Sequence, residues 1–316
     1  MARLASSLQN IKDHYTVVVI GSGYGGGIAA SRLARAGQTV CLLERGKEFQ
    51  PGEYPDTNVE FLSESQVHLP DGSTLGPRTG LYDFRVNNEL NALVGCGLGG
   101  TSLINAGVAL RPEDRVFDDP RWPEEIRQSL KTTLNDGFNR AEQMLGSTPY
   151  PADVRPVPKL LAHQRSAQAF GAETFARLPI NVTFQDGVNQ FGVEQLACNL
   201  CGDCMSGCNY HAKNTLIMNY LPDAKNHGAE IFCEVGVRSL EREGDQWLVH
   251  YQPLSEGRDS FDAPTQFVRA DIVILAAGTF GSTEILLRTK AAGLPLSDQV
   301  GQHFSGNGDM IGFSYN

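Results

Sequence analysis

The hydrophobic and polar positions near the start of the chain predict a strand, a tight turn and a helix, in that order. Residues 15–20 (YTVVVI) form a nearly continuous apolar run, as expected of a parallel strand that is buried on both faces. After a glycine-rich turn, small and apolar residues recur at helical spacing over 28–36, and Gly37 ends the helix. A second apolar strand over 39–43 ends at Glu44. This order predicts a βαβ unit and an α/β fold.

The turn between the first strand and the helix has the spacing G-x-G-x-x-G. Gly21 permits the tight turn, Gly23 lets the backbone approach a pyrophosphate, and Gly26 lets helix and strand pack closely. Glu44 can accept hydrogen bonds from an adenosine ribose, and its charge disfavours NADP, whose extra phosphate it would repel. The alternative is a chance glycine turn. Strand, turn, helix and acidic residue together favour a Rossmann-type dinucleotide site.

Two later segments indicate which dinucleotide is bound. Residues 95–107 (GCGLGGTSLINAG) carry glycines and small hydroxyl residues that could lay backbone N–H groups along a flat ring system and its ribityl chain. Residues 271–278 (DIVILAAG) predict a buried strand ending in Gly278, with a helix following through Leu287. Taken singly, these are a loop and an ordinary βα unit. In this order after a Rossmann start, they fit a cofactor longer than NAD, and we expect FAD.

Composition and charge narrow the class of partner. A chain of 316 residues with 41% hydrophobic residues lies near the size at which one core divides in two, so we expect two domains. The net charge of -10 disfavours a nucleic-acid partner and leaves a small molecule. No apolar stretch approaches the roughly 18 to 20 residues of a membrane span, and the N-terminus lacks the apolar centre of a signal peptide. These features predict a cytoplasmic protein.

Four of the seven cysteines predict a metal or redox site. Cys198, Cys201, Cys204 and Cys208 have the spacing C-x2-C-x2-C-x3-C, which matches the bacterial ferredoxin run except that Asn209 replaces the usual proline. An iron–sulfur cluster is the first interpretation. Zinc, which also accepts four thiolates, is a second, and free or pairwise-oxidised cysteines are a third.

Several ordered motifs together resemble the glucose-methanol-choline oxidoreductases, and among these most closely the bacterial cholesterol oxidases. The motifs are GSGYGGG, LLERG, GLGGTSLINAGVAL, RVFDDPRWP, AAGTFGSTEILLRT and FSGNGD. The resemblance implies FAD, a two-domain architecture, and oxidation of a sterol or another large apolar alcohol by hydride transfer to the flavin. Relatives that feed electrons to a haem partner carry an iron–sulfur cluster, whereas the well-known cholesterol oxidases lack these cysteines. An electron-acceptor protein is therefore an expected partner.

The resemblance also implies which residues bind the cofactor. It implies that Tyr24 and Gly25 lie at the pyrophosphate, Glu44 at the ribose, and Val237, in a strand over 230–240, beside the adenine. The remaining expected contacts lie in the glycine-rich segments, beneath the isoalloxazine or at the start of the substrate region: Gly100, Thr101, Asn105, Val108, Gly278 and Asn307.

The domain organisation expected from these features is discontinuous. Residues 14–112 and 213–304 form the FAD-binding domain, 113–212 a cap on the substrate side with an amphipathic helix over 122–145, and 305–316 the start of the substrate domain. Oxidation of a hydroxyl needs a positioned base. The family's catalytic histidine would lie beyond residue 316, and His211 and His303 read as loop residues, so no catalytic base is assigned. A rival interpretation follows, in which the chain is a truncated or non-catalytic FAD-binding or electron-transfer fragment that turns over no alcohol alone.

Overall fold

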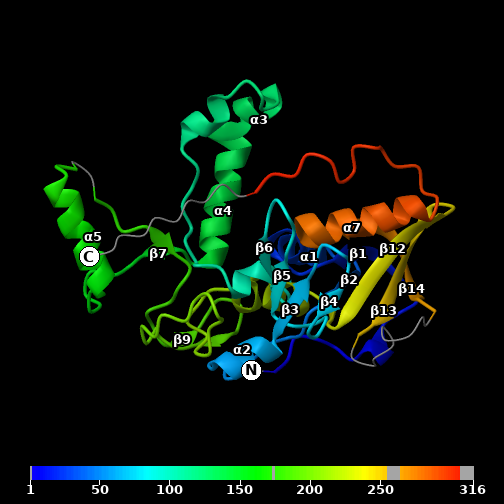
Figure 1. Ribbon diagram of the computed structural model, residues 1–316, viewed down its shortest axis with the longest axis horizontal. Helices are drawn as coiled ribbons and strands as arrows, with labels where there is room; N and C mark the ends of the chain where they lie inside the picture. The colour runs from blue at the N-terminus through cyan, green and yellow to red at the C-terminus, as the bar shows by residue number, and fades with distance from the viewer. Residues whose placement is uncertain (1, 173–174, 255–263, 307–316) are drawn as a thin grey trace.

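The fold is organised around one six-stranded sheet. The computed structural model describes residues 2–172, 175–254 and 264–306. The sheet has the order β11-β2-β1-β14-β13-β12, with the first four strands parallel and the last two antiparallel (Figure 1). Its strands are β1 (His14–Ile20), β2 (Val40–Leu43), β11 (Glu230–Phe232), β12 (Val235–Glu243), β13 (Gln246–Pro253) and β14 (Gln266–Leu275).

β1 lies at the centre of the core, and its side chains alternate between two apolar layers. Val17 and Val19 pack in the layer that contains α1 (Tyr24–Arg35) and α6 (Tyr220–Asn226). Val18 packs in the opposite layer, which includes residues of β12, β13 and α7 (Gly278–Ala291). The three valine side chains are fully buried. Burial of each contributes roughly 1.5–3 kcal/mol, which explains the apolar run at these positions.

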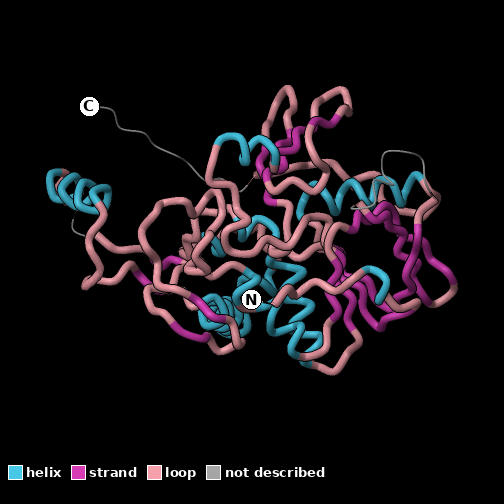
Figure 2. The backbone as a smooth tube through the Cα atoms, turned by 90° about the horizontal axis from the view of Figure 1, so that it is seen from below, coloured by secondary structure: helices cyan, strands magenta, loops and turns pink. Residues whose placement is uncertain are grey.

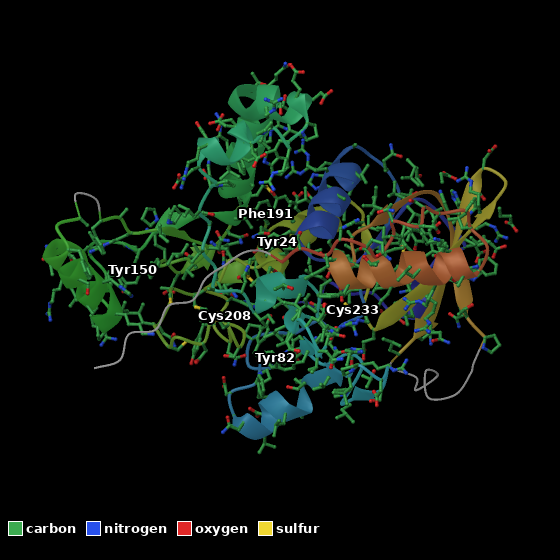
Figure 3. The ribbon with its side chains drawn as sticks, turned by 45° about the horizontal axis from the view of Figure 1, so that its top comes forward. Tyr24, Tyr82, Tyr150, Phe191, Cys208 and Cys233 are labelled. Carbon is green, nitrogen blue, oxygen red and sulfur yellow. The ribbon has the colours of Figure 1, made fainter. Side chains whose placement is uncertain are left out.

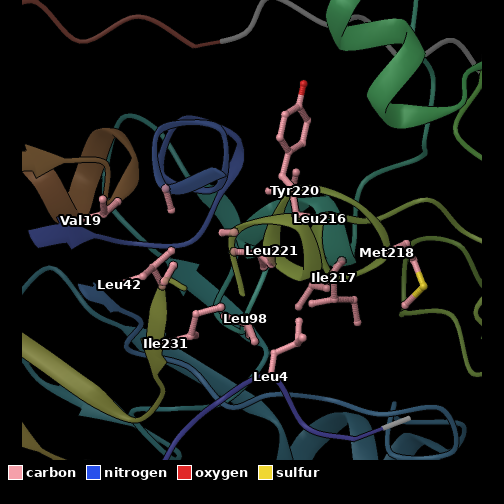
Figure 4. Packing of buried hydrophobic residues seen from close by; sticks show 14 of the residues in the cluster. Leu4, Val19, Leu42, Leu98, Leu216, Ile217, Met218, Tyr220, Leu221 and Ile231 are labelled. Atoms are coloured by element: carbon pink, nitrogen blue, oxygen red, sulfur yellow. The ribbon is translucent and has the colours of Figure 1, made fainter. Parts of the chain in front are cut away.

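The helical layer beside the parallel strands is held by aliphatic side chains. Figure 4 shows Leu42 and Ile231 from the strands facing Leu216, Ile217 and Leu221 of the helical segment. That segment consists of the short helix η5 (Leu216–Met218) and α6. The parallel strands therefore have a helical layer on this face, while α7 contributes to the opposite layer, as expected of the predicted α/β fold.

The predicted strand, turn and helix at the N-terminus are confirmed, with shifted bounds. α1 begins at Tyr24, directly after Gly23 as its N-cap, because the first helical turn lies inside the glycine-rich turn itself. Gly37, just past the helix, has a φ of 79°, a left-handed conformation that favours glycine. β2 is buried at all four positions.

The single strand expected over 230–240 is wrong, because the chain changes edges of the sheet there. β11 pairs with β2 at one edge, whereas β12 pairs with β13 at the other. Glu234, between them, has a φ of 60°, a left-handed conformation that ends an extended strand. Val237 therefore lies in β12.

The predicted strand over 271–278 also differs from the structure. β14 begins five residues earlier, at Gln266, and ends at Leu275. Its second half is not fully buried, and Ile272 is 50% exposed. The cause is the position of α7, which packs against β12.

A smaller four-stranded sheet lies beside the first. Its order is β4-β3-β5-β6, and its strands are β3 (Ser65–His68), β4 (Thr74–Leu75), β5 (Tyr82–Arg85) and β6 (Ala92–Gly95). It follows α2 (Asn58–Ser63), whose N-terminus has a capping box formed by Thr57 and Glu60. β6 leads directly into the short helix η2 (Gly100–Leu103).

The segment 113–212 is mostly loop with short elements, and it projects away from the six-stranded sheet (Figures 1 and 2). The amphipathic helix expected over 122–145 is interrupted: a π-helical stretch over Leu130–Leu134 separates α3 (Glu124–Ser129) from α4 (Asn135–Leu145). The other elements outside the two large sheets are η1 (Leu8–Asn10), η3 (Asp114–Asp118), β7 (Thr148–Pro149), α5 (Pro158–Ala169), β8 (Pro179–Ile180), β9 (Gly187–Val188) and β10 (Glu194–Gln195).

The six-stranded sheet takes strands from both 14–112 and 213–304, the two segments expected to form one domain. The domain boundaries themselves remain a prediction. Within the described residues, no helix combines the length and apolar character needed to cross a membrane.

Candidate functional site

A cavity of about 580 Å³ lies at the carboxyl ends of the parallel strands. β1, β2 and β14 each end at this edge, and the residues that follow them, including Gly21, Glu44 and Ala276, line the cavity. In open α/β sheets, ligands bind in the crevice outside the carboxyl ends of the strands. The cavity therefore lies where a dinucleotide is expected.

The glycines of the turn form a cradle that larger residues would fill. A Cβ on Gly26 would lie 1.8 Å from the carbonyl oxygen of Gly21, so only glycine permits this approach of helix to strand. Gly21 has a φ of 93°, and a Cβ there would lie 2.5 Å from the carbonyl oxygen of Ala276. A Cβ on Gly23 would meet no atom within 4 Å, which leaves its backbone open to the cavity. This cradle fits a pyrophosphate at the N-terminus of α1.

Glu44 ties the end of β2 to the glycine turn. Its carboxylate accepts hydrogen bonds from the Ser22 N–H at 3.0 Å, the Ser22 hydroxyl at 2.6 Å and the Gly46 N–H at 2.8 Å. The side chain is buried but still lines the cavity. A carboxylate has about four acceptor positions, so capacity remains for a ribose hydroxyl.

The segment 95–101 forms a wall of the same cavity, with Gly95, Cys96, Gly100 and Thr101 in the lining. The Gly99 N–H donates to the Ser22 hydroxyl at 2.8 Å, which attaches this wall to the glycine turn. Further along, the Asn105 Nδ2 donates to the Tyr24 hydroxyl at 2.9 Å. Burial raises the pKa of Tyr24, while the hydrogen bond from Asn105 acts in the opposite direction. Tyr24, the first residue of α1, is therefore a neutral side chain in the cavity lining.

Most of the expected cofactor residues meet at this cavity. Those that line it are Gly21, Gly23, Tyr24, Gly25, Glu44, Gly100, Thr101, Val237 and Gly278. Gly26 packs behind the turn, and Asn105 reaches the lining only through Tyr24. Val108 lies apart from it, 51% exposed and bridged to Ile180. Asn307 lies outside the described residues.

Sequence reasoning missed a group of arginines. The lining includes Arg45, Arg78, Arg85, Arg238 and Arg288. They come from separate strands, loops and α7, so no cluster of basic residues in the sequence predicted that they line one cavity. The available signals were the position of Arg45, directly after Glu44, and the i,i+4 pair of Glu284 and Arg288 on α7. Guanidinium groups suit the phosphates of a dinucleotide.

Part of this positive charge is neutralised by a buried carboxylate. Asp83 is fully buried and pairs with Arg45 and Arg85. Arg85 also pairs with Glu284. His68 is the one histidine among the described residues that lines the cavity, and burial lowers its pKa. His211 and His303 do not line it.

The four cysteines of the ferredoxin-like motif come together at a second, much smaller cavity of about 20 Å³. They lie on a loop without helix or strand, and Cys201 is exposed while the other three are partly buried. In the described part of the chain, no three or more His, Cys, Asp or Glu residues are arranged to hold a metal ion. The sequence motif thus brings the thiols near one another, but their arrangement does not support the predicted iron–sulfur or zinc site.

Lys213 lies between the two cavities and was not singled out by the sequence. It is 3% exposed and lines the cysteine cavity. Its Nζ donates to the carbonyl oxygens of Leu103 at 3.0 Å, Asn105 at 2.6 Å and Cys204 at 2.8 Å. Burial lowers the pKa of Lys213 to about 8. Figure 3 labels Tyr24, which lines the large cavity, and Cys208, which lines the cysteine cavity.

Comparison with known families agrees with this geometry. A family model described as GMC oxidoreductase matches residues 23–305. The chain belongs to the GMC oxidoreductase family. Members of this family bind FAD, and the fold described above is that of its FAD-binding domain. The predicted family and fold class are confirmed.

Several curated relatives are named as cholesterol oxidases or long-chain-alcohol oxidases. A cholesterol oxidase of Mycobacterium tuberculosis is 31% identical over 326 residues, which cover 95% of this chain and 53% of that protein. A cholesterol oxidase of Acinetobacter baumannii is 27% identical over 314 residues, covering 94% and 55%. A long-chain-alcohol oxidase of Arabidopsis thaliana is 29% identical over 220 residues, covering 69% and 26%. The chain thus spans about half the length of the cholesterol oxidases that it matches.

Among solved structures, pyridoxine 4-oxidase from Mesorbium loti matches with a TM-score of 0.49 and 16% identity. The match covers 86% of this chain and 51% of that one.

Proposed function

We propose that the large cavity binds FAD, with the ADP half placed by the glycine turn and Glu44. The observation that carries this proposal is the cradle of Gly21, Gly23 and Gly26 at the N-terminus of α1, where a pyrophosphate can approach the backbone. The arginines of the lining add positive charge for the phosphates, and Val237 offers an apolar surface for the adenine.

We further propose that the protein oxidises the CH–OH group of a sterol or another large apolar alcohol. FAD, when bound, supplies the hydride acceptor. The chain's own residues bind and orient the cofactor through the glycine turn and the 95–101 wall. Support for the substrate class comes from the relatives, which are described as cholesterol and long-chain-alcohol oxidases.

A second candidate is an FAD-binding or electron-transfer function without alcohol turnover by these residues alone. It is favoured by the histidines: His211 and His303 lie away from the cavity. His68 lines the cavity, but its ring nitrogens already contact Gln66, Thr74 and Asp83. An electron-acceptor protein as partner and a cytoplasmic location also remain proposals.

Anaerobic titration separates these candidates. The 316-residue chain is titrated with FAD and then mixed with cholesterol or with a long-chain primary alcohol, while the visible absorbance of the flavin is followed. FAD binding with loss of absorbance on adding alcohol supports alcohol oxidation. FAD binding without such loss supports the second candidate, and failure to bind FAD contradicts both.

A further inference from the structure

The cysteine loop, residues 198–208, gathers its four thiols around one small cavity. That cavity measures about 20 Å³, which is room for about one water molecule. The thiols act on one another across it, because burial raises the pKa of Cys204 and the charges of the other three loop cysteines raise it further. Among the described residues, these thiols are not arranged as the ligands of a metal ion. The loop therefore brings four thiols close together, and the proposed FAD site gives them no role.

A buried cation lies beside these thiols. Lys213 lines the same cavity and is 3% exposed. Burial lowers the pKa of Lys213 to about 8, whereas the charges of Cys204 and Cys208 act to raise it. A positive charge next to a cysteine favours the thiolate, which is the nucleophilic form. The cavity thus combines thiols with a group that stabilises their charged state.

The two halves of the cysteine loop are held differently. Residues 204–208 are fixed to other segments, because their backbone carbonyl oxygens accept hydrogen bonds from the Lys213 Nζ at 2.8 Å and from the Tyr82 hydroxyl at 2.6 Å. By contrast, every hydrogen bond that the structure describes for residues 199–203 stays within the loop. The first half can therefore move toward the second without breaking a hydrogen bond to another segment.

Cys201 is the thiol that a dissolved oxidant meets first. It is exposed, whereas the other three cysteines of the loop are partly buried. Burial raises the pKa of Cys201, and the charge of Cys208 adds to this increase, as expected of neighbouring thiols. Cys208, labelled in Figure 3, lies on the fixed half of the loop. A disulfide needs the two Cβ atoms within roughly 3.5–4.5 Å, and a movement of residues 199–203 can bring Cys201 to its partner.

We propose that Cys201 and Cys208 form a thiol–disulfide exchange site that reacts with a small disulfide such as glutathione disulfide. The Cys201 thiolate attacks one sulfur of the small disulfide, which gives a mixed disulfide and releases one thiolate. The Cys208 thiolate then attacks the Cys201 sulfur, the mixed disulfide bond breaks, and the second thiolate leaves. The released thiolates take up the two protons that the cysteines lose. The chain is oxidised by two electrons, and the small disulfide is reduced to two thiols. This inference does not depend on the proposed FAD site.

Thiol mapping by mass spectrometry tests the exchange on the reduced 316-residue chain. The chain is incubated with glutathione disulfide, the reaction is stopped with acid, and the free thiols of the unfolded chain are alkylated before digestion. We expect the free thiols to fall from seven to five, with one bond between Cys201 and Cys208, and dithiothreitol to restore all seven. The reaction should be faster at mildly alkaline pH than at neutral pH, because burial raises the pKa of Cys201 and the thiolate is the attacking form.

Matched serine variants separate the roles of the two thiols. Cys208→Ser keeps the attacking thiol but removes the second one, so glutathione should stay attached to Cys201. Cys201→Ser should lose the oxidation of the loop. Cys233→Ser is the control, because Cys233 is a free cysteine outside the loop, and its loop should be oxidised as in the wild type.

Four results would overturn the proposal. They are seven free thiols after the incubation, a disulfide that joins a different pair, equal oxidation of the loop in Cys201→Ser, and iron or zinc retained through purification that keeps the loop thiols from reacting. The thiol map of the wild type decides the first two and the last of these without any variant.

Discussion

The two cavities contain equally regular sequence motifs but have walls of different construction. At the large cavity, G-x-G-x-x-G runs from the end of β1 into the first turn of α1, and the pairing of β1 with β2 and β14 fixes where this turn begins. At the small cavity, C-x2-C-x2-C-x3-C lies on a loop that contains no strand or helix. The first motif has the geometry that its spacing predicts, whereas the second gathers its thiols without metal-binding geometry.

This comparison shows for which kind of motif the residue spacing alone predicts the geometry of the site. The glycine motif works through the backbone, so its geometry follows once strand and helix form. A metal motif works through side-chain atoms, whose positions depend on the conformation of the whole loop as well as on the spacing. Substitutions in the two regions should therefore differ in effect.

The largest effect is expected from Gly26→Ala. The added Cβ would lie 1.8 Å from the Gly21 carbonyl oxygen, and backbone on both sides must move. We expect the free energy of unfolding to fall by about 3 kcal/mol or more, measured by chemical denaturation. Gly25→Ala is the matched control, because its Cβ would meet its nearest atom at an ordinary 3.9 Å. Equal stability of the two variants would show that the close approach at Gly26 is not essential.

Glu44→Ala should have the next largest effect. It removes acceptors for Ser22 and Gly46 and the expected partner of the ribose. Charge-assisted hydrogen bonds contribute about 1.5–3 kcal/mol, so FAD affinity should fall roughly 10- to 100-fold. Titration by flavin fluorescence measures this. Glu53→Ala, at a half-exposed ion pair with Arg3, should bind FAD normally. Unchanged FAD affinity in Glu44→Ala would show that Glu44 does not bind the cofactor.

A smaller, pH-dependent effect is expected at His211, beside the cysteine loop. Burial lowers its pKa, and its Nε2 has no hydrogen-bond partner. A group whose pKa is lowered by folding contributes stability that is present above its unfolded value of 6.5 and is lost as the pH falls. His211→Asn, which tolerates the φ of 54°, should lose less stability than the wild type between neutral and acidic pH. Identical pH profiles of the melting temperature would contradict this.

The smallest effect is expected in the double variant Cys201→Ser, Cys204→Ser. The carbonyl of Cys204 that accepts from Lys213 is retained, and the thiols are not arranged as metal ligands. FAD affinity and melting temperature should stay close to those of the wild type. A large loss of either, together with loss of iron and acid-labile sulfide measured anaerobically, would restore the ferredoxin-like interpretation.

The sequence predicted the βαβ unit well because each of its signals is local. It could not predict the break at Glu234, since a left-handed residue leaves no mark in a hydrophobic run. The exposure of β14 also depends on where α7 packs, which is a tertiary property.

The residues that line the large cavity also fall into two groups, those that the sequence predicted and those that it did not. The glycines and Glu44 were predictable from one motif. Arg85 and Arg238 were not, because residues far apart in the chain become neighbours only through folding. The placement of Val108 away from the cavity has the same origin, since its bridge to Ile180 spans two distant segments.

The central claim is that the glycine turn at the end of β1 holds the ADP half of FAD. Backbone amide chemical shifts of the isotopically labelled chain, recorded during titration with ADP, test it most directly. The account predicts saturable shifts at Gly21, Gly23 and Gly25, with the amides of the cysteine loop unchanged. Shifts confined to the cysteine loop, or none at the glycine turn at saturating ADP, would contradict it.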